Sequence, residues 1–161
     1  MKFLTISLVA IATLFNISAN AACPMGNLTL STQAQVDAFP VNYPGCSNLS
    51  VNLTIQGADI TNLDGLSGLV TIDGILLIQY SHALVDITGL MNITTITREL
   101  QFEECHALTS LDGLQNLTSL GKLELQGMDA LTDISQLSGL TTITDDLHIN
   151  DCDALTNLNG F

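Results

Sequence analysis

Basic residues are scarce in this chain. Three Lys and Arg residues stand against 16 Asp and Glu residues, which gives a formal net charge of −13 at pH 7. A protein that binds nucleic acid needs clusters of Lys and Arg that neutralise phosphates and release counterions. The composition therefore excludes a nucleic-acid partner. The same repulsion disfavours anionic membrane surfaces and acidic glycans.

Long apolar runs are also absent after the first residues. Lys2 precedes an apolar stretch over residues 3–17, and Ala19 and Ala21 form the small-residue pattern that signal peptidase reads. We therefore expect residues 1–21 to be a signal peptide. Its removal takes away Lys2 and no acidic residue, so the mature charge is −14. A lipid anchor on Cys23 is the alternative, but Asn20 stands where such signals usually have Leu.

No later stretch approaches the roughly 20 apolar residues of a membrane-spanning helix. We expect no membrane insertion and a secreted protein, either extracellular, on the cell surface or periplasmic. Motifs of established catalysis are missing as well: the sequence has no Gly-x-Ser-x-Gly elbow, no His-Glu-x-x-His helix and no phosphate loop. We expect no enzymatic activity, no cofactor and no metal.

A repeated unit organises the rest of the chain. Segments of the form Leu-Asp-Gly-Leu recur at intervals of 24, 24, 23 and 24 residues, and they begin at Leu63, Ile87, Leu111, Ile134 and Leu158. Other apolar residues fall into the same register, in columns such as Leu53/Leu76/Leu100/Leu123/Leu147 and Ile55/Ile78/Phe102/Leu125/Ile149. Within a repeat the apolar residues alternate over short pieces, which is the period of strands and not of helices.

The pattern predicts an all-β fold over residues 53–161, a right-handed parallel β-solenoid with about 24 residues and three short strands per coil. Equivalent residues of successive coils would then lie about 4.8 Å apart. A leucine-rich horseshoe with an outer helix is the weaker alternative, because Gly and β-branched residues fill the place where that helix would lie.

These repeats, together with Cys23-Pro24 and the segment from Gln33 to Cys46, resemble the receptor L-domain family of bacterial secreted surface proteins. The resemblance covers residues 22–161. It implies extracellular recognition without catalysis, and it supplies no universal binding residues to carry over.

Residues 22–52 are predicted to form an N-terminal cap. Thr32 and Gln35 resemble a helix capping box, and Val36 and Phe39 share one face of a short helix that Pro40 would end. The helix would cover the open end of the solenoid. Cys23 and Cys46 flank it, and in an exported protein we expect them to form a disulfide worth roughly 3 kcal/mol.

The other two cysteines, Cys105 and Cys152, occupy one column two coils apart. Their expected separation of roughly 9–10 Å exceeds the limit of about 7 Å between the Cα atoms of a disulfide. We therefore predict two buried free thiols. At the other end of the array, Phe161 occupies the position of Leu66 and its equivalents. The chain is then either a truncated piece of a longer array or a solenoid whose last coil associates end to end with a partner.

Polar side chains on the exposed side of one strand row form the predicted binding site. A flat, amide-rich and acidic face suits an extended ligand, either a protein or a neutral glycan, although a merely solvated face has the same pattern. The predicted contact residues are Gln79, Gln101, Glu103, Glu124, Gln126, His148 and Asn150.

Three other patterns have less support. Hydroxyl rows such as Thr71, Thr95, Ser119 and Thr142 resemble ice-binding surfaces, although Thr is also common on exposed strands. His82 and His106 share a column with Asp59, Asp129 and Asp153, which would suit a metal but also an ordinary turn. Arg98 and Lys122 are expected to share a column, and one basic pair does not make the acidic cluster of a pectin-cleaving enzyme.

Overall fold

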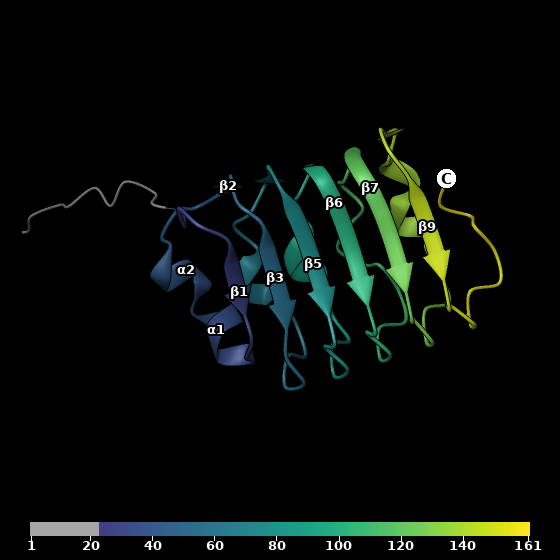
Figure 1. The fold of residues 1–161 in the computed structure, drawn as a ribbon, viewed down its shortest axis with the longest axis horizontal. Coiled ribbons are helices and arrows are strands. Elements are labelled where there is room, and N and C mark those ends of the chain that lie inside the picture. The colour runs from purple at the N-terminus through teal and green to yellow at the C-terminus, as the bar shows by residue number, and fades with distance from the viewer. Residues whose placement is uncertain (1–22) are drawn as a thin grey trace, which may run out of the picture.

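The fold is built around one parallel sheet, and the computed structural model describes residues 23–161 of the chain. The predicted signal peptide lies outside these residues. The strands of the sheet's main row lie side by side in sequence order (Figure 1), and each pairs in parallel with the next. They are β1 (Leu28–Leu30), β3 (Leu53–Gln56), β5 (Ile75–Gln79), β6 (Thr95–Glu103), β7 (Ser119–Gln126) and β9 (Leu147–Asn150). The prediction of a β-rich fold is confirmed.

Three shorter strands form a second parallel row against the first halves of β6 and β7. They are β2 (Asn48–Leu49), β4 (Thr71–Ile72) and β8 (Thr142–Ile143). The register follows the predicted columns, since Leu53 pairs with Leu76, Leu76 with Leu100, Leu100 with Leu123 and Leu123 with Leu147. Each row of core side chains therefore runs continuously from one repeat to the next.

The third segment of each repeat differs from our prediction of a third strand. It contains single β-bridges, Asn62 with Asp86 and Ser110 with Asp133. Three of these segments continue into 3-10 helices, η1 (Asp64–Leu66), η2 (Thr88–Leu90) and η3 (Ser135–Gly139). The carboxylates of Asp86 and Asp133 accept the backbone N–H two residues on, at 2.7 and 2.9 Å. Such local bonds favour a turn over a strand.

Apolar columns fill the space between the sheet rows and the 3-10 turns. Leu63, Ile87, Leu111 and Ile134, which begin the repeats identified in the sequence, are at most 1% exposed. Leu158, the fifth member of that column, is 54% exposed. The core is thus continuous through four repeats and open at the fifth.

Two short helices, α1 (Gln33–Asp37) and α2 (Phe39–Asn42), lie at the β1 end of the sheet (Figure 1). The hydroxyl of Thr32 accepts the Gln35 N–H at 3.3 Å, as the capping box predicts. Val36 and Phe39 are both buried. Our expectation that Pro40 ends the helix was wrong: α1 ends before it, and Pro40 lies in the first turn of α2, where a missing N–H costs nothing. No helix of residues 23–161 is long and apolar enough to cross a bilayer.

Cys23 and Cys46 form the predicted disulfide, with their Cα atoms 5.0 Å apart. Cys105 and Cys152 are free thiols. Cys105 is buried as predicted, but Cys152, in the last repeat that the structure describes, is only half-buried.

Candidate binding face

The predicted contact residues lie together on the outer side of strands β5, β6, β7 and β9, in two rows that cross the strands. We call these two rows, with their equivalents on β3, the polar sheet face. One row is Thr54, Leu77, Gln101, Glu124 and His148, and the other is Gln56, Gln79, Glu103, Gln126 and Asn150. Their side chains are half-buried on β3 to β7 and exposed on β9, whereas the residues between them are buried on β3 to β7.

Amide groups dominate the second row. The side-chain N–H of Gln79 donates to the amide oxygen of Gln56 at 2.7 Å, so these two amides are fixed by each other. Within residues 23–161, the amides of Gln101 and Gln126 take no side-chain hydrogen bond. Each amide offers two donors and an acceptor. These amides on the face are therefore available to hydrogen-bond with a ligand or with water.

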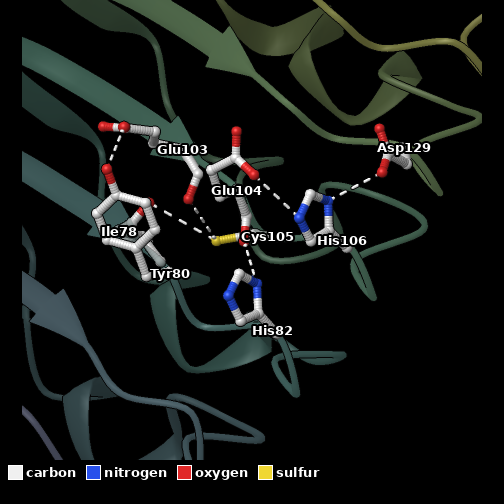
Figure 2. A network of polar contacts seen from close by, with 8 residues as sticks. All are labelled: Ile78, Tyr80, His82, Glu103, Glu104, Cys105, His106 and Asp129. Atoms are coloured by element: carbon white, nitrogen blue, oxygen red, sulfur yellow. Dashed lines mark hydrogen bonds and ion pairs between the residues drawn. The ribbon is translucent and has the colours of Figure 1, made fainter.

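Tyr80, which the sequence analysis did not single out, lies where β5 ends beside this row. Its hydroxyl donates to the Glu103 carboxylate at 2.8 Å, and its backbone N–H donates to the Glu103 carbonyl at 2.9 Å (Figure 2). The hydrogen bond from Tyr80 to Glu103, and then the charge of that carboxylate, raise the pKa of the phenol. The side chain remains 49% exposed.

A third row of side chains, beside the polar sheet face, contains further charged groups. Lys122 pairs with Glu99 across β6 and β7, with its Nζ 3.0 Å from the Glu99 carboxylate, and it also contacts the Glu124 carboxylate. Hydrogen bonds to Glu124 and Glu99 raise the pKa of Lys122. The cation is thus neutralised by its own neighbours on the sheet.

Arg98 does not share a column with Lys122, contrary to our prediction. The register between β6 and β7 shifts by one residue between Ile96 and Glu99, so Glu99 takes the position opposite Lys122. The shift makes room for an extra residue in β6, as in a β-bulge. Arg98 instead lines a hollow of about 450 Å³ at the start of the strands, with Ile75, Thr97, Glu99, Lys122, Asp145 and Asp146.

The His82 and His106 rings stack in adjacent turns, with centroids 5.0 Å apart and an interplanar angle of 7° (Figure 2). Both nitrogens of His106 lie 3.0 Å from carboxylate oxygens, one from Glu104 and one from Asp129. His82 Nδ1 lies 2.8 Å from the Glu104 carbonyl oxygen. Three of the four ring nitrogens of His82 and His106 thus lie at 3.0 Å or less from a protein oxygen atom. In the described part of the chain, no group of three His, Cys, Asp or Glu side chains is placed to hold a metal ion.

No family model matches this chain, and no curated protein or solved structure matches it.

One hydroxyl row is in register on the short strands, where Thr71, Thr95, Ser119 and Thr142 pair in sequence. Not every hydroxyl of this row is available to solvent, because the Thr71 hydroxyl donates to the Asn48 side chain at 2.7 Å. A second predicted hydroxyl row consists of Thr61, Thr109, Thr132 and Thr156. In this row the Thr132 hydroxyl donates to the Thr109 carbonyl at 3.2 Å. These bonds use hydroxyls to tie repeats together, which is a structural role.

Proposed function

We propose that this protein is an extracellular or cell-surface recognition module that binds a protein or a glycan through the polar sheet face. On this proposal the repeats form a right-handed parallel β-solenoid of receptor L-domain type with about 24 residues per coil. The observation that carries the proposal is the alignment of the contact residues in two rows with unpaired amides. A row of fixed spacing suits an extended ligand.

The chemistry of the described side chains favours binding over catalysis. Burial raises the pKa of the Cys105 thiol to about 11, so this group is a poor nucleophile at neutral pH. Lys122 is held by two carboxylates. The Cys23–Cys46 disulfide is compatible with export to an oxidising compartment. No step of the proposed function requires a cofactor.

The test is binding of the labelled mature protein to an array of glycans and purified surface proteins. A double variant, Gln101→Arg with Gln126→Arg, places two bulky cations on the polar sheet face. The matched control, Thr88→Arg with Thr109→Arg, adds the same charge at exposed positions away from that face. We expect the sheet variant alone to lose binding. Equal binding by both variants would contradict the proposal.

A second candidate, a structural module that associates end to end, is favoured by the apolar surface of the last described repeat. Leu147, Leu158 and Phe161 are 39%, 54% and 55% exposed. Helices α1 and α2 lie at the opposite end of the sheet (Figure 1). The open repeats of two copies would therefore meet, related by a two-fold axis.

Sedimentation velocity over a range of concentrations tests this association. We expect a dimer that Leu158→Glu dissolves, whereas Val85→Glu, at a residue 61% exposed in another part of the molecule, leaves it intact. A monomer at every concentration would remove this candidate.

A further inference from the structure

Tyr80 has an unusual backbone conformation for an aromatic residue. Its φ is 51°, in the left-handed region that residues other than Gly, Asn and Asp rarely adopt. The equivalent turns contain Glu104, Gly127 and Asp151, with φ of 54°, 62° and 52°. Gly and Asp suit this conformation, and an aromatic residue pays an energetic penalty there. The ring does not offset the penalty by entering the core, since the residue is 49% exposed.

The Tyr80 ring is held beside the polar sheet face. Its hydroxyl is fixed by Glu103, which follows Gln79 in the row of Gln56, Gln79, Glu103 and Gln126 (Figure 2). An aromatic ring whose orientation is already set loses little entropy on binding. It offers a flat apolar surface to one side of a ligand, while the amides and the carboxylate of the row offer hydrogen bonds.

The charges on and beside this face limit the class of ligand that it can bind. Glu99, Glu103 and Glu124 outnumber Lys122, which already contacts two of them. An acidic glycan would be repelled, and a ligand with many hydroxyl groups would satisfy amides and carboxylates alike. Neighbouring residues within one row lie on adjacent strands, so their backbones are about 4.8 Å apart. This spacing is close to the length of one sugar residue in an extended β-1,4-linked chain.

We infer that the polar sheet face binds an extended, neutral, β-1,4-linked glycan, which runs across the strands along the Gln79, Glu103 and Gln126 row and stacks a sugar ring on Tyr80. This inference rests on the proposed function and specifies its ligand class. The apolar faces of pyranose rings match the Tyr80 ring, and the hydroxyl groups at the ring edge reach the side chains of successive strands.

Calorimetric titration of the mature protein with cellohexaose and with chitohexaose tests the inference, with hexagalacturonate as the charged comparison. We expect saturable binding of at least one neutral hexasaccharide and none of the charged one. Tyr80→Asn removes the ring but suits the left-handed backbone, so it should weaken binding roughly tenfold without lowering the thermal midpoint. Tyr80→Phe keeps the ring and should retain most of the affinity.

Two results would overturn the inference: no saturable binding of either neutral hexasaccharide at millimolar concentration, or equal affinity in Tyr80→Asn and the parent protein. The proposed function is separable from this outcome. If the array identifies a protein ligand that the Gln101→Arg, Gln126→Arg variant loses, the recognition module stands and the glycan inference falls.

Discussion

At the scale of single residues, the two free thiols differ in burial and should differ in reactivity. Cys105 is 0% exposed and burial raises its pKa to about 11, whereas Cys152 is half-buried, and burial also raises its pKa. The thiolate is the reactive form. In the folded protein at pH 8, we expect iodoacetamide to modify Cys152 at least about tenfold faster than Cys105.

Peptide mass spectrometry over a time course measures both alkylation rates. Denaturant is the control, since the rates should converge once burial is lost. Equal rates in the folded state would mean that the last repeat protects Cys152 as fully as the interior protects Cys105.

Residues with a positive φ could not be predicted in this sequence from single positions. Tyr80 and Glu104 carry no local signal for a positive φ, because neither residue type favours it. The positive φ is indicated only by comparing repeats, because Gly127 and Asp151, which favour it, occupy the equivalent turns. The sequence analysis therefore did not single out Tyr80, although it predicted the neighbouring Gln79 as a contact residue from strand alternation.

At the scale of elements, glycine allows the turns of adjacent repeats to pack closely. A Cβ on Gly89 would lie 1.9 Å from the Leu63 carbonyl oxygen, and a Cβ on Gly113 would lie 2.1 Å from that of Ile87. The neighbours are backbone atoms, so relief requires the repeats to separate. We expect Gly89→Ala to destabilise the protein by about 2–3 kcal/mol.

Gly68→Ala is the matched control for this substitution, since the nearest atom to its Cβ, the Cys46 carbonyl oxygen, lies 3.7 Å away. Urea unfolding should give a lower midpoint for Gly89→Ala and a nearly unchanged one for Gly68→Ala. Equal midpoints would show that the contact between the turns is softer than the geometry implies.

The leucine columns allow a second prediction about stability, because equivalent leucines are buried in the inner repeats and partly exposed in the last described repeat. Leu100 on β6 is 0% exposed, and Leu147 on β9 is 39% exposed. We expect Leu100→Ala to cost about 2–5 kcal/mol and Leu147→Ala about 1 kcal/mol, because less apolar surface is removed from the core. Denaturant unfolding of both variants measures the difference, and equal costs would mean that the last repeat is covered in solution.

These elements were predicted to different degrees. Alternating apolar residues and the repeat interval identified the strands and their columns. Successive side chains of a strand point to opposite sides of the sheet, so every second residue is apolar where one side faces the core. The position of Arg98 was predicted wrongly although the spacing shows the extra residue: Ile96 and Leu100 are four positions apart, whereas their partners Leu120 and Leu123 are three apart. The 3-10 turns were missed because they depend on a local hydrogen bond that competes with strand pairing. In this bond the carboxylate of Asp86 or Asp133 accepts the backbone N–H two residues on.

At the scale of the whole molecule, the acidic composition should make stability depend on salt. The 16 acidic residues against three basic ones repel one another in the folded state more than in the expanded unfolded chain. Salt screens this repulsion. The Lys122 ion pairs act in the opposite sense, but they involve one cation among many anions.

We therefore expect the thermal midpoint of the mature protein to rise between 10 mM and 500 mM NaCl, by about 4 °C if the repulsion relieved is on the order of 1 kcal/mol. Calorimetry measures the midpoint. Replacing exposed Thr88 and Thr109 with Lys lowers the negative charge by two and should reduce the effect of salt while raising the midpoint at 10 mM NaCl. A midpoint that falls as salt is added would mean that the ion pairs of Lys122 contribute more to stability than the net charge removes.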